Sequence, residues 1–303
     1  MTRRSGKTAL VFSGDTTHFF AIGTAIINFL GVNPKWNGDI FVFLDKIRNT
    51  EKDSIKRISS NFQNIKIELL TYEFPNPSFT LRNSYAYRRF TPMVFSKFEI
   101  FRLIENYERI LYSDYDVVFL DNIEELYQPQ NSFDIAMLSG SDSLEKWTFV
   151  PHINGFNLTE AMHGAGLIVV SNTVLQTLSA EYLYQLARKH GWKLRQPEQM
   201  IISLVIQELK LTFHALDFNV YAATPDTTAR KSPAKIAHSP GFSKFWHKED
   251  KVWLHYYSSF VKLTNFRESK LPSSTIRPYR LFFLFVRIAN YFHRIRKKFT
   301  ELF

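Results

Sequence analysis

Two aspartates, Asp114 and Asp116, stand one residue apart inside an otherwise apolar stretch, residues 110–120 (ILYSDYDVVFL). In an extended chain, side chains two residues apart point the same way, so both carboxylates would face the same space. Their oxygens are ligands that suit a hard divalent cation carrying phosphate. A strand that ends in a polar turn would give the same pattern. Because β-forming residues flank the pair on both sides, however, something must compensate its charge, which favours a metal site at a sheet edge.

The segments before this pair alternate between strand and helix patterns. Strands are predicted at residues 8–13, 39–44 and 65–72, with helices at residues 19–30 and 49–61 between them. This order predicts an α/β fold with a mostly parallel sheet and right-handed crossovers. Ligands of such sheets bind beyond the carboxyl ends of the strands. Residues 15–18 and 114–116 both lie at such an end, so we expect them to line one site.

The rest of the chain continues as helices, strands and long loops. Helices are predicted at residues 92–107, 174–190 and 198–209, and strands at residues 164–171 and 212–218. Three segments lack periodicity and are predicted to be loops: residues 78–92, 139–163 and 224–250.

Size and composition exclude several classes of protein. A chain of 303 residues with 45% apolar content can bury a substantial core. It has no cysteine, which excludes disulfides, thiolate metal sites and a cysteine nucleophile. The apolar stretch that follows the charged amino terminus is too short for a signal or membrane-spanning segment. We therefore expect a cytoplasmic protein.

The positive charge is concentrated at the carboxyl end. Of a net charge of +10, residues 266–303 contribute a surplus of seven, from nine Lys or Arg and two Glu. The simplest division is a domain at residues 1–265 and a basic, aromatic tail at residues 266–303. As a helix, residues 277–303 would carry Phe and Leu on one face and Arg and Lys on the other, which predicts peripheral binding to the anionic inner face of the cell membrane. Packing of the apolar face on the domain is the alternative. A nucleic-acid contact fits the charge, but no recognition motif accompanies it, so no nucleic-acid partner is expected.

Several segments together resemble glycosyltransferase family 8, the retaining nucleotide-sugar transferases with a GT-A fold, over roughly residues 8–265. The opening VFSGDTTHFFAIGTAIINFL is similar to the family's first strand, nucleotide-contacting loop and first helix. The resemblance implies that Asp15 and Thr17 contact the nucleotide and that Lys97 faces its diphosphate. It also implies that Asp114 and Asp116 form the D-x-D metal motif.

Two further segments match the part of the family pattern that surrounds the reacting sugar. MHGAGLIVVSNTVL resembles a strand whose Asn contacts the sugar, and here Gly164 takes that place, with His163 beside it as a possible substitute. In PEQMI, Glu198 takes the position of the family's Asp and Gln199 keeps its Gln. The resemblance makes Glu198 and Gln199 the candidate catalytic residues on the β-face of the sugar.

The segment VWLHYYSSFVK, residues 252–262, resembles the family's H-[FY]-x-G-x-x-K-P-W segment. We read it as an apolar strand, with His255 as the third metal ligand and Lys262 as a diphosphate contact. In the family the Lys follows the His by six positions, and here it follows by seven. Two carboxylates with one imidazole favour Mn²⁺, or Mg²⁺, over Ca²⁺.

These segments predict a metal-dependent retaining glycosyltransferase that moves a hexose from a UDP-sugar to a glycan acceptor, either lipid-linked or part of a surface polysaccharide. The alternative is a protein of the same fold that binds a sugar nucleotide without turning it over. A basic scaffold protein at the membrane, which would bind no nucleotide, is a third reading.

Overall fold

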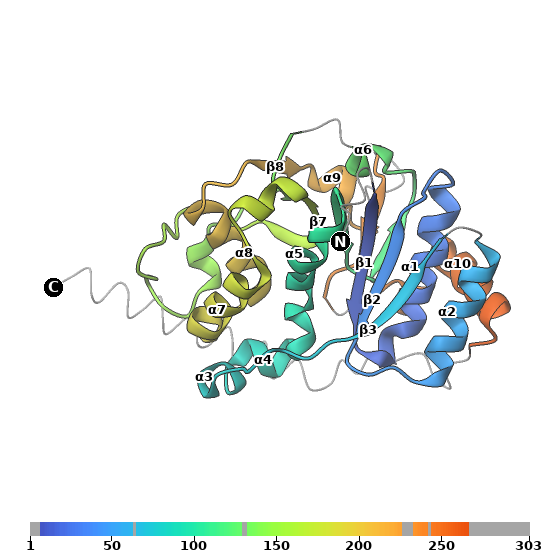
Figure 1. The fold of residues 1–303 in the computed structure, drawn as a ribbon, viewed down its shortest axis with the longest axis horizontal. Coiled ribbons are helices and arrows are strands. Elements are labelled where there is room, and N and C mark those ends of the chain that lie inside the picture. The colour runs from blue at the N-terminus through green and yellow to red at the C-terminus, as the bar shows by residue number, and fades with distance from the viewer. Residues whose placement is uncertain (1–6, 63–64, 129–131, 226–232, 242–243, 267–303) are drawn as a thin grey trace.

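The computed structural model describes residues 7–62, 65–128, 132–225, 233–241 and 244–266. Helices and strands alternate over most of this length (Figure 1). In chain order the elements are β1 (Thr8–Gly14), η1 (Thr16–His18), α1 (Phe19–Val32), β2 (Asp39–Leu44), α2 (Asn49–Asn61), β3 (Ile67–Thr71), α3 (Phe79–Arg82), α4 (Tyr85–Phe90), η2 (Pro92–Glu99), α5 (Ile100–Leu103), η3 (Ile104–Asn106), β4 (Arg109–Ser113), β5 (Val117–Phe119), α6 (Glu124–Tyr127), β6 (Ile135–Leu138), η4 (Leu144–Trp147), β7 (Gly164–Ser171), η5 (Asn172–Gln176), α7 (Ala180–His190), η6 (Gly191–Lys193), α8 (Pro197–Glu208), β8 (Phe213–Leu216), α9 (Phe218–Tyr221), β9 (Ile236–His238), η7 (Phe245–His247) and α10 (Lys251–Thr264).

A seven-stranded sheet in the order β3-β2-β1-β4-β7-β6-β8 forms the centre of the molecule. Strand β7 runs antiparallel to both of its neighbours, and the other neighbouring strands pair in parallel. A separate two-stranded ribbon pairs β5 with β9. The prediction of a mostly parallel α/β sheet is therefore confirmed.

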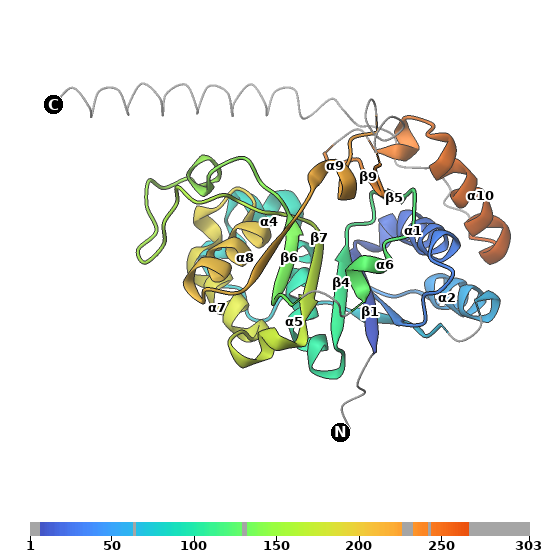
Figure 2. The ribbon, with the colours of Figure 1, turned by 90° about the horizontal axis from the view of Figure 1, so that it is seen from above.

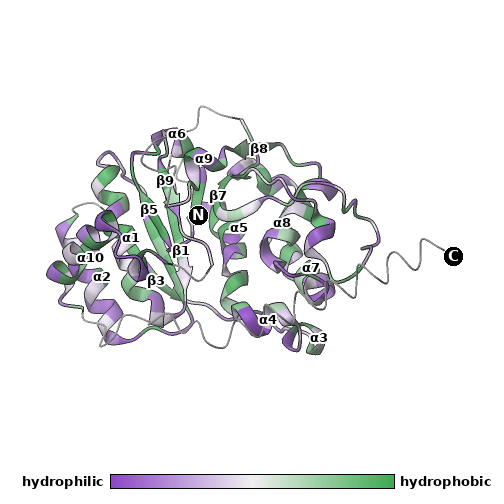
Figure 3. Ribbon diagram, turned by 180° about the vertical axis from the view of Figure 1, so that it is seen from behind, coloured by the Kyte–Doolittle hydropathy of each residue, from purple (hydrophilic) through white to green (hydrophobic). Residues whose placement is uncertain are grey.

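Helices cover both faces of this sheet, as Figure 2 shows from above. Alternate residues of β1 face opposite sides: Ala9 and Val11 belong to the core under α5, α7 and α8, whereas Leu10 and Phe12 belong to the core under α1 and α10. Burial on both faces explains why the strands are almost continuously apolar, which Figure 3 shows as green along β1 and β5. The outer helices carry both colours.

The apolar stretch at residues 110–120 divides between two sheets. Its first part is β4, in the centre of the main sheet, and its second part is β5, in the ribbon. The chain bends at Asp114, Tyr115 and Asp116, which separate the two strands. The two aspartates therefore lie at a strand end, as the sequence predicts, but the strand after them leaves the main sheet.

Several segments have a different structure from the one predicted, among them residues 224–250, predicted as a loop, which contain β9 and η7. Residues 78–92, predicted as a loop, contain α3 and α4, whose N-caps Ser78 and Ser84 accept hydrogen bonds from the backbone amides of Leu81 and Tyr87. Residues 251–264, predicted to include an apolar strand, form helix α10. Its cap is Asp250, whose carboxylate accepts from the backbone amides two and three residues on.

The predicted amphipathic helix at residues 277–303 lies outside the described residues, as does all of the basic tail except Phe266. Among the helices that the structure describes, none combines the length and apolar character needed to span a bilayer.

Candidate active site

A cleft of about 450 Å³ opens at the carboxyl ends of β1 and β4 and beside the first residues of β7. It is the position where parallel α/β sheets bind ligands. The cleft is lined by six of the predicted site residues: Asp15, Lys97, Asp114, Asp116, Glu198 and Gln199. Residues far apart in the sequence therefore meet at one place.

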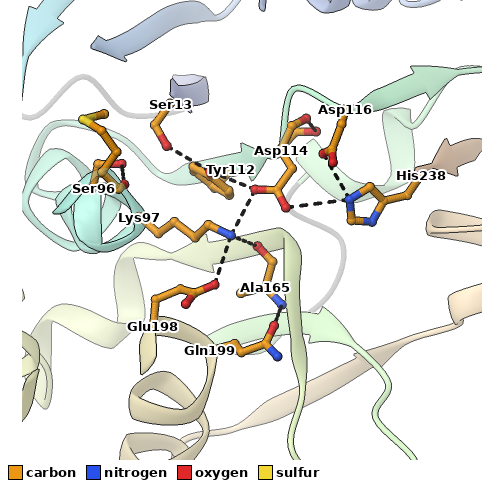
Figure 4. A network of polar contacts seen from close by, with 12 residues as sticks. Ser13, Ser96, Lys97, Tyr112, Asp114, Asp116, Ala165, Glu198, Gln199 and His238 are labelled. Atoms are coloured by element: carbon orange, nitrogen blue, oxygen red, sulfur yellow. Dashed lines mark hydrogen bonds and ion pairs between the residues drawn. The ribbon is translucent and has the colours of Figure 1, made fainter. Parts of the chain in front are cut away.

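Asp114, Asp116 and His238 form a group that could hold a metal ion. One ligand atom from each lies within 4.8 Å of the others, and His238 Nε2 is 3.2 Å from Asp116 Oδ1 and 3.8 Å from Asp114 Oδ2. The ribbon explains this arrangement, since His238 pairs with Val117, the residue after the second aspartate. In Figure 4 the imidazole points toward both carboxylates.

The chemistry of this group fits a divalent cation. The two carboxylates suit Mn²⁺ or Mg²⁺, the imidazole suits a transition metal such as Mn²⁺ or Zn²⁺, and space for further ligands remains on the side of the cleft. Lys244 forms a salt bridge with Asp116, so this position already binds a positive charge. Burial alone would raise the pKa of Asp116, but His238 and Lys244 outweigh it and hold that pKa well below its usual range.

Gly166 on β7 leaves room for the imidazole. A Cβ at this position would lie 2.7 Å from His238 Cε1 and 3.4 Å from Asp114 Oδ2. The first of these distances is shorter than any ordinary contact, so the ring could not keep its place beside a larger residue. The glycine therefore has a steric role beneath the metal-binding group.

Lys97 is a buried cation between two acidic side chains. Its Nζ lies 3.0 Å from Asp114 Oδ1 and 3.5 Å from Glu198 Oε1, and it donates a hydrogen bond of 3.0 Å to the carbonyl oxygen of Ala165. Figure 4 shows this ammonium group on the side of Asp114 away from His238. Burial would lower the pKa of Lys97, but the two carboxylates more than reverse this effect, so the lysine is charged.

Glu198 and Gln199 occupy the first turn of α8, which begins at Pro197. Glu198 is 5% exposed, and its Oε2 has no hydrogen-bond partner among the described residues. Burial raises the pKa of Glu198 despite the nearby Lys97. The Oε1 atom of Gln199 accepts a hydrogen bond of 3.3 Å from the amide of Ala165, which fixes the amide side chain against β7.

The structure places the two predicted nucleotide contacts on the loop after β1, Asp15 and Thr17, in different surroundings. Asp15 lines the cleft, and burial raises its pKa. Thr17 is exposed, lies near His18 (Oγ1 to Nδ1 3.4 Å), and is not among the residues that line the cleft. Its neighbour Thr16 is buried, and its amide and hydroxyl both donate to Asp45 Oδ1, at 2.7 and 2.5 Å. Thr16 thereby positions the loop that carries Asp15.

The structure places His238, and not the predicted His255, beside the two aspartates. His255 and Lys262 are exposed on α10, and neither lines the cleft. The imidazole beside the two aspartates belongs to His238, and the lysine that approaches them is Lys244. These two residues are six apart, with Gly241 between them and Trp246 after them, so HSPGFSKFW fits the H-x-x-G-x-x-K spacing that residues 255–262 lack. That spacing was the signal that could have identified them from the sequence.

Gly164 and His163 belong to the segment that resembles the family's sugar-contacting strand. Gly164 lines the cleft and offers no side chain there. His163, the possible substitute for the missing Asn, turns away and stacks on Phe213 with ring centroids 4.0 Å apart. Neither residue therefore supplies a polar side chain to the cleft at this point.

The fold and the position of the site define a glycosyltransferase of the GT-A class. The chain belongs to glycosyl transferase family 8, whose family model matches residues 9–250. This range contains His238 and Lys244 and ends before His255 and Lys262.

Solved structures share this fold at low sequence identity. The galactosyltransferase LgtC in complex with donor and acceptor sugar analogs is 14% identical, with 90% of this chain and 99% of that chain covered and a TM-score of 0.59. The glycosyltransferase GlyE of Streptococcus pneumoniae TIGR4 is 17% identical, with 86% and 63% covered and a TM-score of 0.59. The bifunctional glycosyltransferase WbbM is 15% identical, with 88% and 50% covered and the same TM-score. No curated protein sequence matches the chain significantly.

Proposed function

We propose that the protein is a metal-dependent, retaining glycosyltransferase that moves a hexose from a UDP-sugar to a glycan acceptor. The observation that carries the proposal is the placement of Asp114, Asp116 and His238 beside the buried cation Lys97 in one cleft. A nucleotide diphosphate is a poor leaving group until its charge is neutralised. A metal-binding group next to a fixed ammonium group is suited to that task. The galactosyltransferase LgtC, which shares the fold, is in complex with donor and acceptor sugar analogs.

Each residue has a role in this proposal. Asp114, Asp116 and His238 would hold Mn²⁺, or Mg²⁺, which supplies Lewis-acid stabilisation of the diphosphate when bound. Lys97 adds positive charge on the other side of Asp114, and Lys244 is the second cation that reaches the same phosphates. Asp15 contacts the nucleotide from the end of β1. Thr17 lies in the same loop as Asp15, and its predicted contact with the nucleotide rests on that position alone.

Glu198 and Gln199 are the proposed residues on the β-face of the sugar. Retention of configuration requires one of two routes. Either a nucleophile attacks from that face, or the acceptor attacks from the same face as the leaving group. The Oε2 atom of Glu198 is buried and has no hydrogen-bond partner among the described residues, so this oxygen is available to interact with the sugar. The amide of Gln199 is fixed by Ala165 and would orient the sugar.

The proposed acceptor is a lipid-linked or surface glycan, reached from the cytoplasmic face of the membrane. The basic tail, residues 277–303, would hold the protein there on anionic lipid. No nucleic acid takes part in this function. A division into a catalytic domain at residues 1–265 and a binding tail at residues 266–303 fits the concentration of positive charge after residue 265.

A panel of UDP-hexoses tests the proposal: UDP-glucose, UDP-galactose, their N-acetylated forms and UDP-glucuronate, with and without Mn²⁺. Release of UDP is measured in the absence of an acceptor, because slow hydrolysis of the donor requires only the donor site. We expect Mn²⁺-dependent release from one donor, lost in Asp116→Ala and kept in the exposed control Asp121→Ala. Release that persists in Asp116→Ala would refute the metal assignment.

One observation favours the alternative of a non-catalytic sugar-nucleotide-binding protein. Gly164 supplies no polar side chain to the cleft where the family has an Asn, and the ammonium group of Lys97 partly neutralises the carboxylate of Glu198. Tight binding of UDP-sugar and Mn²⁺ by calorimetry, with no release from any donor and no transfer to any glycan, would establish that alternative.

A further inference from the structure

Three large aromatic side chains that the cleft does not use are exposed near one another. Phe79 begins α3 and is 82% exposed, Phe149 follows η4 and is 46% exposed, and Trp192 in η6 is 39% exposed. A phenylalanine with four fifths of its surface in water is unusual, because burial of such a ring is worth about 2 kcal/mol. Exposed apolar groups that gather in one region mark a binding surface.

Packing contacts place these side chains on one region of the molecule. Helices α3 and α4 both contact η6, and Gly191 lies so close to Leu81 that a Cβ there would meet Leu81 Cδ1 at 2.9 Å. The amide of Phe149 donates to the carbonyl oxygen of Lys193 at 2.8 Å, which ties the segment after η4 to η6. The rings of Phe149 and Tyr85 meet edge to face at 5.7 Å.

Basic side chains outnumber acidic ones in the two segments that carry Phe79 and Trp192. Residues 74–96 and 182–197 together contain seven Arg or Lys and no Asp or Glu. The described Arg82, Arg88 and Lys189 are exposed. We call the group formed by Phe79, Phe149, Trp192, Arg82, Arg88 and Lys189 the aromatic–basic surface.

This surface is continuous with the mouth of the cleft. Arg89 and Phe90, at the end of α4, line the cleft, and so does Gln196, three residues after η6. The guanidinium of Arg89 lies 4.9 Å from the ring centre of Phe90. Helices α2 and α10 lie at the opposite end of the molecule in both Figure 1 and Figure 2.

We propose that the aromatic–basic surface binds an anionic lipid bilayer, with its rings at the boundary between headgroups and acyl chains. Aromatic rings next to Arg and Lys are the composition that binds such an interface, where the rings enter the apolar boundary and the cations contact lipid phosphates. A sugar ring would be a poorer partner for Phe79, which brings no hydrogen-bonding group. Because this region borders the cleft, the mouth of the cleft faces the bilayer and receives a lipid-linked acceptor directly. Only this last consequence rests on the proposed function.

A fluorescent label at position 79 tests the proposal in the full chain. The protein has no cysteine, so Phe79→Cys provides a single attachment site for an environment-sensitive fluorophore. Val252→Cys, at an exposed apolar position of α10, is the matched control. With phosphatidylcholine–phosphatidylglycerol vesicles, we expect blue-shifted, brighter emission at position 79. At position 252 we expect no change in emission. Unchanged emission at position 79 would overturn the proposal, including the case in which the protein sediments with the vesicles through another segment.

Charge removal provides a second measurement. Each basic residue near an anionic surface strengthens binding about fivefold, so Arg82→Gln/Arg88→Gln/Lys189→Gln should weaken vesicle binding on the order of a hundredfold. The matched variant removes three exposed lysines at the other end, Lys52→Gln/Lys56→Gln/Lys251→Gln, and should weaken it less. Equal losses would refute a localised surface.

Two controls separate this proposal from binding of an anionic glycan and from the proposed transferase activity. An emission change at position 79 with dextran sulfate but not with vesicles would assign the surface to an anionic glycan and overturn the lipid proposal. UDP release from soluble donor is measured in the same variants. It should be unchanged, since none of the substituted residues lines the cleft, so failure of the lipid proposal and failure of the proposed transferase activity are distinguishable.

Discussion

The backbone amide of Asp114 donates a hydrogen bond to the carbonyl oxygen of Gly166, with an N···O distance of 2.9 Å. This bond joins the end of β4 to β7 and holds Gly166 directly beneath the imidazole of His238. The width of the metal-binding group is therefore set by a residue that contributes no ligand atom.

Substitution of that glycine should disturb the metal site without unfolding the protein. In Gly166→Ala the new methyl group displaces His238, and we expect Mn²⁺ affinity to fall at least tenfold, as for other residues that orient a metal ligand. Electron paramagnetic resonance of a Mn²⁺ titration measures the free ion. Gly164→Ala, two residues earlier on β7, meets only Leu138 at 3.3 Å and should bind Mn²⁺ normally. Equal affinities in the two variants would contradict the steric role of Gly166.

The identity of the third ligand can be settled by a pair of histidine substitutions. Loss of a direct ligand in His238→Ala should lower Mn²⁺ affinity by on the order of a hundredfold or more, since loss of an outer partner already costs 10- to 100-fold. His255→Ala removes an exposed imidazole on α10 and should leave affinity unchanged. Calorimetric titration with Mn²⁺ distinguishes them, and the reverse order of effects would restore His255 as the ligand.

Lys97 should be a large contributor to stability as well as to the site. Lys97→Met leaves Glu198 buried without its cation, and breaking a buried pair in this way costs about 3–5 kcal/mol. The double variant Lys97→Met/Glu198→Gln removes both charges and should recover part of that loss. Urea unfolding measures the free energies. Lys35→Met, which breaks an exposed pair with Glu124, should cost under about 1 kcal/mol. A loss that small in Lys97→Met would contradict the role of the buried pair.

His190 should make stability depend on pH below neutrality. Burial, together with the smaller effect of the charges of Lys193 and Lys189, lowers the pKa of His190 from 6.5 to about 4. As the pH falls from 6.5 toward 4, the unfolded chain binds a proton that the folded chain does not, so stability is present above about pH 6.5 and is lost on acidification. Between pH 7 and pH 5 the loss should be about 2 kcal/mol.

Urea unfolding of His190→Leu at these two pH values measures that contribution. The pH-dependent difference should shrink by about 2 kcal/mol relative to the unsubstituted protein. His255→Leu, at an exposed position, should keep the full difference. An unchanged difference in His190→Leu would show that another group is responsible.

The sequence predicted the parts of the site that depend on local pattern. Period and order placed Asp15 and Asp114 at strand ends, and in a mostly parallel sheet such ends meet. The direction of β7 could not be read in this way, because the alternation of its side chains is the same in either direction. The pairing of Lys97 with Glu198 joins residues a hundred positions apart, and no local signal encodes it.

Two errors had signals in the sequence. Trp253, Tyr257, Phe260 and Thr264 recur at spacings of four, three and four, which is the period of a helix rather than of a strand. His238 and Lys244 have the expected six-residue separation but lie in a segment rich in Pro, Ser and Lys. Composition there concealed a short strand, β9, whose three residues are buried where β9 pairs with the distant strand β5.

The ribbon of β5 and β9 also sets the order in which the site can be assembled. Asp114 and Asp116 leave the ribosome 124 and 122 residues before His238, and during that interval the chain still has to supply β6, β7 and β8. Contacts of such large sequence separation form late, because the loop between them must first be closed. A nascent or truncated chain that ends before residue 236 therefore carries both carboxylates but not His238, and we expect metal affinity to appear only once the chain is folded through β9.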